Sequence, residues 1–293
     1  MDRSRRRVLQ QALAGLGSLG LGSAQAAPDT LAALERRHGG RLGVVMQDLG
    51  GGPGLTHRAD ERFALCSTFK LWLAAAVLAE ADAGRWRLDD RLHWQAADAV
   101  PNSPVTATHD ARAGMTLSAL AEAAQCHSDN LAANLLLRHL GGPAALTDWL
   151  RRQGDSVTRL DRTEPAMNQV RAGEAQDSTS PAAIAANLTR LLRGDLHSAS
   201  SRDRLLGWMR TTRTGPRRLR AGLPSGWTLG HKTGTGLDDG LPDRLNDVGI
   251  VWPPGGRAPR VVAVYYEGPQ RGSRDPRPQD EAVLAAVGRL ASR

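Results

Sequence analysis

The stretch Cys66-Ser67-Thr68-Phe69-Lys70-Leu71-Trp72-Leu73 opens a predicted helix and carries the first chemically suggestive pair of side chains. The i, i+3, i+4, i+7 spacing of an amphipathic helix is met by Phe69, Trp72, Leu73 and Ala76. Ser67 and Lys70 are three residues apart, so at a helix start they share a face, where apolar neighbours would desolvate the amine. A serine hydroxyl becomes a nucleophile when such a base takes its proton. An N-capping serine beside a snorkelling lysine has the same spacing, so both interpretations stay open at this point.

Lysine is rare in this chain, because 36 of its 38 basic Lys and Arg residues are arginine. Arginine stays protonated, whereas a desolvated lysine can release its proton, so Lys70 and Lys232 invite a chemical explanation. Lys232 lies in His231-Lys232-Thr233-Gly234-Thr235-Gly236. On a strand, Lys232 and Gly234 would face the same side, and the glycine would let another segment approach closely. An ammonium group and hydroxyls at such an edge suit a substrate carboxylate.

A third motif, Ser128-Asp129-Asn130, directly precedes the predicted helix 131–140. Any of its three residues could be the N-cap of that helix. With this composition, however, chance would produce all three motifs together at a rate of about 3 in 100,000. The combination therefore predicts a catalytic site.

Composition excludes several other classes of protein. The 293 residues, 41% hydrophobic and 23% charged, are typical of a soluble chain with one large domain or two small ones. Basic residues are scattered, and 2 Tyr and 2 Phe offer no stacking platform, which argues against nucleic-acid binding. Two cysteines form neither a disulfide framework nor a zinc site. Beyond the N-terminal segment no apolar run is long enough for a membrane span.

Residues 1–26 have the pattern of an export signal. A charged segment Ser4-Arg5-Arg6-Arg7 precedes an apolar, Gly-rich stretch, and Ala24-Gln25-Ala26 supplies a cleavage site. The paired arginines resemble the twin-arginine type of signal. We therefore expect a periplasmic protein.

The mature chain divides into unlike parts. Helices are predicted at 31–38 and 280–291, and strands at 42–49, 247–252 and 260–267. The middle, from 67 to 209, is rich in Ala and Leu and shows no convincing strand. This distribution predicts an α+β protein of two domains: a split α/β domain (27–60 and 210–293) and an all-helical insert (61–209), with a cleft between them.

The order S-x-x-K, S-D-N, K-T-G resembles that of class A β-lactamases and penicillin-binding proteins. Further similarity to class A is carried by the segments 41–44, 60–63, 132–136 and 219–223, and the nearest resemblance is to chromosomal enzymes of Gram-negative bacteria. The resemblance implies an antiparallel sheet covered by the N- and C-terminal helices, and a monomer. It also implies hydrolysis of a penicillin or cephalosporin, with no metal or organic cofactor.

The resemblance also implies a role for each residue of the motifs. Ser67 would attack the lactam carbonyl, Lys70 would relay or accept its proton, and Ser128 would protonate the leaving nitrogen. The N–H groups of Ser67 and Thr235 would form the oxyanion hole. Substrate would be bound by Asn130, Lys232, Thr233, Thr235 and Arg220.

The segment Arg162-Thr163-Glu164-Pro165-Ala166-Met167-Asn168 resembles the Ω-loop motif of class A, with the loop at about 162–177. Glu164 and Asn168 would hold and deprotonate the water that hydrolyses the acyl-enzyme. Arg162 and Asp177 would pair at the loop's neck, and the Glu164–Pro165 bond is a candidate cis peptide. Whether Lys70 or Glu164 is the base for acylation stays open.

Several positions depart from the family pattern. His231 stands where aspartate is usual, Asn102 falls near a position that is commonly aromatic, and residues 237–245 form a turn about four residues longer than in relatives. A disulfide of some carbapenemases would need cysteine at position 236, which is Gly236 here, so that bridge cannot form. For Cys66 and Cys126 we expect buried free thiols, and a bridge between them is the alternative.

Two other functions share the first half of this chemistry. A penicillin-binding peptidase and a non-hydrolysing β-lactam sensor both acylate their serine, but neither sheds the acyl group quickly. Glu164 with Asn168 favours a hydrolase over both. A generic esterase is disfavoured because no G-x-S-x-G motif surrounds Ser67.

Overall fold

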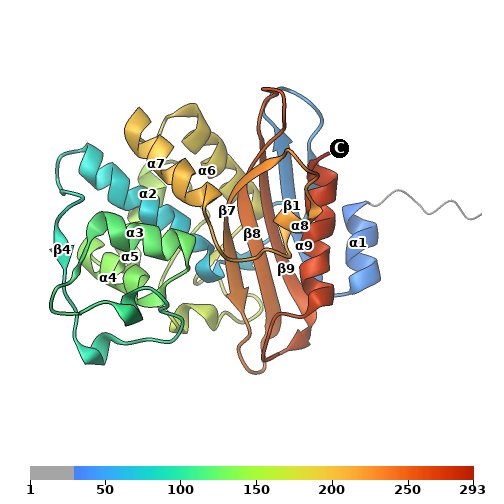
Figure 1. Ribbon diagram of the computed structural model, residues 1–293. Coiled ribbons are helices and arrows are strands. Elements are labelled where there is room, and N and C mark those ends of the chain that lie inside the picture. The colour runs from blue at the N-terminus through green and yellow to red at the C-terminus, as the bar shows by residue number, and fades with distance from the viewer. Residues whose placement is uncertain (1–29) are drawn as a thin grey trace, which may run out of the picture.

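The computed structural model describes residues 30–293, so the predicted export signal lies outside the described residues. Figure 1 shows a sheet with helices against both faces. Its five strands run antiparallel in the order β2-β1-β9-β8-β7. Their bounds are β1 (Arg41–Asp48), β2 (Leu55–His57), β7 (Thr228–Gly236), β8 (Pro242–Trp252) and β9 (Arg260–Arg271). The predicted antiparallel sheet is confirmed, and the short edge strand β2 adds to it.

The two terminal helices and one short internal helix cover one face of the sheet (Figure 1). They are α1 (Leu31–His38), the short α8 (Leu219–Gly222) and α9 (Pro278–Ala291). Strand alternation divides β1 between two cores: Leu42, Val44 and Met46 pack under these helices, while Val45 packs into the core on the other face. The predicted covering by N- and C-terminal helices is therefore confirmed.

The other face carries the remaining α-helices of the described chain (Figure 1). They are α2 (Phe69–Asp82), α3 (Leu117–Cys126), α4 (Asn130–Leu140), α5 (Pro143–Arg152), α6 (Pro181–Arg193) and α7 (Ala199–Arg210). Every residue of α2 from Phe69 to Leu78 is buried, so this helix is enclosed all round instead of having the predicted single apolar stripe. Its alanines leave room for neighbours, and α2 shares one core with Ile250 and Tyr265 of the sheet.

Two sequence predictions need correction. The segment 67–209 does contain strands, although each has two residues: β4 (Arg91–Leu92) pairs with β5 (Met115–Thr116), and β6 (Ser178–Thr179) pairs with β3 (Phe63–Ala64). Such short pairings leave no alternation in the sequence. The long turn ends at 241, because β8 begins at Pro242 with a bulge between Pro242 and Arg244.

Short 3₁₀ helices complete the structure at η1 (Cys66–Thr68), η2 (Ala96–Asp98), η3 (Thr106–Thr108) and η4 (Ala166–Asn168). None of the helices between residues 30 and 293 is long and apolar enough to cross a membrane.

Candidate active site

Ser67 and Lys70 lie at the junction of η1 and α2. Ser67 belongs to the 3₁₀ turn, and Lys70 is in the first turn of the helix that follows. The lysine Nζ lies 3.0 Å from the serine Oγ and donates a hydrogen bond to it. The two side chains therefore share a face, as their spacing predicts, and the lysine sits where a serine hydroxyl can pass on its proton.

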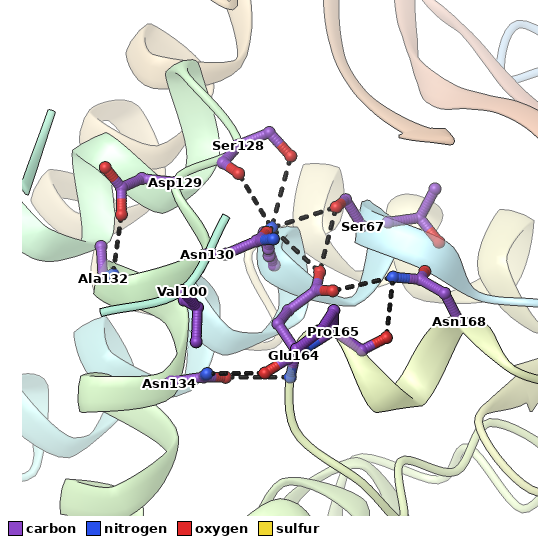
Figure 2. Close-up of polar contacts among 12 residues, drawn as sticks. Ser67, Val100, Ser128, Asp129, Asn130, Ala132, Asn134, Glu164, Pro165 and Asn168 are labelled. Carbon is purple, nitrogen blue, oxygen red and sulfur yellow. Dashed lines mark hydrogen bonds and ion pairs between the residues drawn. The ribbon is translucent and has the colours of Figure 1, made fainter. Parts of the chain in front are cut away.

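The Ser128-Asp129-Asn130 motif lies beside Ser67 and Lys70 and forms a second side of the site. Asp129 is the N-cap of α4, since its carboxylate accepts from the N–H of Ala132 at 2.8 Å. The two residues beside Asp129 instead contact Lys70: the Ser128 carbonyl accepts from Lys70 Nζ at 2.9 Å, and Asn130 Oδ1 accepts from the same amine. Figure 2 shows these groups directed at one point beside Ser67.

The third motif reaches the same point from the sheet. Lys232 of β7 donates from Nζ to Ser128 Oγ at 3.0 Å, so the Ser128 hydroxyl lies between Lys232 and Lys70. A Cβ on Gly234 would lie 3.0 Å from the Leu65 carbonyl oxygen and 3.1 Å from Cys66 Cβ. The predicted close approach therefore occurs, and it sets β7 against the turn that carries Ser67.

Glu164 enters the site from the loop 161–177. The buried Asp177 closes the loop: it accepts from the Asp161 N–H at 2.7 Å and pairs with Arg162 Nε at 2.6 Å. Asn134 of α4 holds the Glu164 backbone by two hydrogen bonds, of 2.9 and 3.0 Å. The Glu164–Pro165 peptide is cis, as predicted.

The Glu164 carboxylate lies directly against Ser67 (Figure 2), and it also contacts Lys70. Its Oε1 is 3.2 Å from Ser67 Oγ and 3.0 Å from Lys70 Nζ. Its Oε2 accepts from Asn168 Nδ2 at 2.9 Å. Four predicted residues, Ser67, Lys70, Glu164 and Asn168, therefore form one connected cluster.

Burial lowers the pKa of both lysines of the site. Both are fully buried. Desolvation lowers the pKa of Lys70, and the Glu164 carboxylate partly opposes this shift. Desolvation lowers the pKa of Lys232 well below its usual value, with repulsion from Lys70 in the same direction. Both amines therefore hold a proton less tightly than a surface lysine, which suits proton transfer.

The opposite wall of the site contains hydroxyls and an arginine. Thr233 Oγ1 is 2.6 Å from Thr214 Oγ1, and Thr235 Oγ1 accepts from a guanidinium at 2.7 Å. That guanidinium belongs to the buried Arg218, and not to Arg220. Arg220 is exposed and reaches His231 Nε2 on the other side of β7, so the prediction that it lies at this wall is wrong, and Arg218 lies there instead.

A cavity of about 690 Å³ joins these groups. Among its lining residues are Ser67, Ser128, Asn130, Glu164, Asn168, Thr233 and Thr235, as the motifs predict. Sequence reasoning noted Asn102, which also lines the cavity, but missed Thr214, Arg218 and Arg274. No local pattern distinguishes these three from the many other threonines and arginines of the chain.

Both cysteines are free and buried, so the alternative bridge between Cys66 and Cys126 is absent. Desolvation raises the pKa of the Cys66 thiol to about 12. In the described part of the chain, no group of three or more His, Cys, Asp or Glu side chains could hold a metal ion.

Gly236→Cys is expected to form a disulfide with Cys66. A Cβ at position 236 would lie 3.1 Å from Cys66 Sγ. Across an S–S bond, a Cβ lies about 3 Å from the partner sulfur, so the geometry is already suitable. We expect stabilisation of roughly 2–4 kcal/mol. Thiol titration in denaturant should give one thiol, against two for the wild-type chain.

Gly236→Ala is the control, because it adds the Cβ without the sulfur. It should bring crowding against Cys66 and no stabilisation. Recovery of three titratable thiols from non-reduced Gly236→Cys would refute the predicted geometry.

Comparison with known proteins agrees with this geometry. The model of the β-lactamase enzyme family matches residues 26–293. The carbapenem-hydrolysing β-lactamase KPC of Klebsiella oxytoca is 42% identical over 279 residues, which cover 95% of this chain and 92% of that protein. The β-lactamase L2 of Stenotrophomonas maltophilia is 42% identical, with coverage of 92% and 86%.

Solved structures give the same result. The ancestral (GNCA) class A β-lactamase matches with a TM-score of 0.82 and 52% identity, covering 89% of this chain and 96% of its own. A β-lactamase from Desulfarculus baarsii matches with a TM-score of 0.83 and 44% identity, covering 89% and 94%. With the three motifs converging on one cavity, the chain belongs to the β-lactamase enzyme family, among its class A members.

Proposed function

We propose that this protein hydrolyses the β-lactam amide of penicillins and cephalosporins, with Ser67 as the nucleophile and Glu164 as the base for deacylation. One observation carries the proposal: Glu164 Oε1 lies 3.2 Å from Ser67 Oγ and 3.0 Å from Lys70 Nζ. A buried carboxylate at the nucleophile is what a hydrolase needs and a permanently acylated protein lacks.

In acylation, Ser67 Oγ forms a bond to the lactam carbonyl carbon and loses its proton. Lys70 and Glu164 both lie within hydrogen-bonding distance of that oxygen, so either can accept the proton. When the carbonyl–nitrogen bond breaks, the nitrogen needs a proton. The Ser128 hydroxyl can supply it and be reprotonated by Lys70 at 3.4 Å or Lys232 at 3.0 Å.

In deacylation, the roles in the cluster change. At 3.2 Å the two oxygens leave no room for water directly between them. Once Ser67 is an ester, however, it no longer donates a hydrogen bond to Glu164. The carboxylate can then take a water, together with Asn168 Nδ2, and deprotonate it for attack on the ester carbon. As the ester bond breaks, Lys70 gives a proton to Ser67 Oγ and takes the one that Glu164 received from the water, so all three groups return to their starting states.

The remaining residues would bind and polarise the substrate. The N–H groups of Ser67 and Thr235 would form the oxyanion hole, a contribution of about 3 kcal/mol per donor in comparable sites. Lys232, Thr233, Thr235 and Arg218 would hold the substrate carboxylate. Asn130 would bind the side-chain amide.

Turnover of a chromogenic cephalosporin, followed together with intact protein mass, tests this function. We expect many turnovers and an acyl mass that disappears as substrate is consumed. A wild-type protein that stays acylated and turns over once would instead support the sensor or the peptidase.

Organisation and location are part of the proposal. The split domain would comprise 27–60 and 210–293, the helical domain 61–209, and the Ω-loop about 162–177. The protein would act as a periplasmic monomer, exported by the signal at 1–26. If the protein is exported through the twin-arginine route, replacing Arg6 and Arg7 with lysine should abolish the β-lactam resistance of cells that produce it. The monomeric state can be tested separately by light scattering.

Arg274 is expected to favour β-lactams that carry a second negative charge. It lines the cavity from the segment after β9, and within residues 30–293 its side chain has no hydrogen-bond or ion-pair partner. Ser273 N–H to Asp243 at 3.0 Å and the Arg277–Asp280 pair at 3.0 Å fix this segment on either side. Arg274→Ala should lower kcat/KM for carbenicillin about fivefold relative to benzylpenicillin, which lacks only the extra carboxylate.

Arg277→Ala is the matched control, since Arg277 belongs to the same segment but not to the cavity lining. High salt should reduce the carbenicillin effect. Equal losses for both penicillins in Arg274→Ala would show that this arginine does not discriminate by charge.

A further inference from the structure

His231 is a buried histidine that the proposed mechanism does not use. It lies on β7 immediately before Lys232. Its Nδ1 is 2.7 Å from Oδ1 of Asp247 on the neighbouring strand β8, and both side chains are fully buried. Strand alternation turns His231 away from Lys232, and it does not line the cavity. Any effect of His231 on substrate must therefore pass through other residues.

The contacts of the ring identify its hydrogen. Arg220 Nη2 lies 3.4 Å from His231 Nε2, and a guanidinium can only donate. Nε2 is therefore the acceptor, and Nδ1 carries the hydrogen that is donated to Asp247. In this assignment the exposed Arg220 donates to His231 Nε2.

Asp247 connects this pair to the carboxylate pocket. Its Oδ2 accepts from the N–H of Leu219 at 3.2 Å, and Leu219 directly follows Arg218. Arg218 in turn donates to the Gly234 carbonyl at 2.8 Å and to Thr235 Oγ1 at 2.7 Å. Hydrogen bonds and one peptide bond thus connect the buried histidine to the half-buried Thr235 at the pocket.

The negative charge of Asp247 also connects it to the carboxylate pocket. Burial lowers the pKa of both Arg218 and Lys232, and the Asp247 carboxylate is one of the groups that oppose this in each case. Asp247 therefore lies behind both cations proposed to bind the substrate carboxylate, and it favours their charged forms.

We propose that the His231–Asp247 pair positions Arg218 for substrate carboxylate binding: His231 orients the Asp247 carboxylate, which fixes the backbone at Leu219 and so the reach of the Arg218 guanidinium. His231 is thus a positioning residue. This inference rests on the proposed role of Arg218 in the pocket.

Three variants test the pair. His231→Leu removes the donor, His231→Asn keeps an N–H close to the Nδ1 position, and Asp247→Asn keeps the shape but removes the charge. For benzylpenicillin we expect His231→Leu to raise KM about tenfold with kcat changed less than about threefold, because binding and not chemistry is affected. His231→Asn should retain most of the wild-type KM.

His57→Leu is the matched control. It removes a similar histidine–carboxylate contact, His57 Nε2 to Glu35 Oε2 at 3.1 Å, between β2 and α1. This variant should lower the melting temperature without changing KM. If His231→Asn is as impaired as His231→Leu, the hydrogen bond to Asp247 is not what matters and the inference is wrong.

A double-mutant cycle with Arg218→Ala tests whether His231 affects KM through Arg218. If His231 acts through Arg218, then His231→Leu should change KM less than about twofold in the Arg218→Ala background. A full tenfold increase there would overturn the inference. If Arg218→Ala itself leaves KM unchanged, the proposed pocket is wrong instead. Should His231→Leu fail to fold, the same cycle is run with Asp247→Asn.

Discussion

Glu164→Ala is expected to accumulate the acyl-enzyme and to lose steady-state turnover. The side chain removed lies 3.2 Å from Ser67 Oγ and is the only carboxylate lining the cavity in residues 30–293. Without it, the water that attacks the ester loses its carboxylate base, and general-base catalysis of this kind contributes roughly 10²–10⁴-fold. Intact mass after mixing with benzylpenicillin should show a persistent adduct, and kcat should fall by that factor.

The control lies in the same loop. Glu174 accepts a hydrogen bond from the Arg171 N–H and does not line the cavity, so Glu174→Ala should deacylate at the wild-type rate. If Glu164→Ala turned over normally, Glu164 could not be the deacylation base. If it failed to acylate at all, Glu164 would instead be required for the first step, and the open choice of acylation base would be settled in its favour.

Lys70→Arg is expected to block acylation although it preserves the positive charge. Desolvation lowers the pKa of Lys70, so its amine can exchange a proton with Ser67 at 3.0 Å, whereas arginine remains protonated. The planar guanidinium also cannot reproduce the contacts of the ammonium with four residues, Ser67, Ser128, Asn130 and Glu164. We expect a loss of roughly 10²–10⁴-fold in the rate of acyl-enzyme formation, measured by quenched-flow mass spectrometry.

Arg85→Lys makes the reverse exchange on the surface, where Arg85 pairs with Glu80 just after α2. It should leave the acylation rate unchanged, because neither residue of this ion pair lines the cavity or contacts Ser67. Rapid acylation of Lys70→Arg would show that the amine does not carry the proton. In that case Glu164 would be the sole remaining base beside the serine.

Much of the fold follows from local pattern in the sequence. The apolar stretches and turns predicted helices at 31–38 and 280–291 and strands at 42–49 and 260–267, and the structure has them within a few residues. Long elements are predictable because one face must be buried along their whole length. The two-residue strands β4, β5 and β6 were not predicted, because their pairing depends on partners distant in the sequence.

The orientation of the side chains in the three short motifs also follows from local pattern. Ser67 and Lys70 share a face because helical geometry places residues three apart together, and Lys232 and Gly234 because strand geometry alternates. Local geometry also accounts for Asp129 as the N-cap of α4. The sequence alone thus determined which side chains each element presents, since this requires only the period of the element.

Only the tertiary structure decided which of these side chains meet. Arg218 is the N-cap of the short helix α8 and Arg220 lies within it, and the contacts of Arg218 with Gly234 and Thr235 place it, and not Arg220, in the pocket. Likewise, the pairing of β7 with β8 sets His231 against Asp247, 16 residues away in the chain. Such choices depend on how whole elements dock, because that packing, and no local period, fixes which of several like residues reaches the cavity.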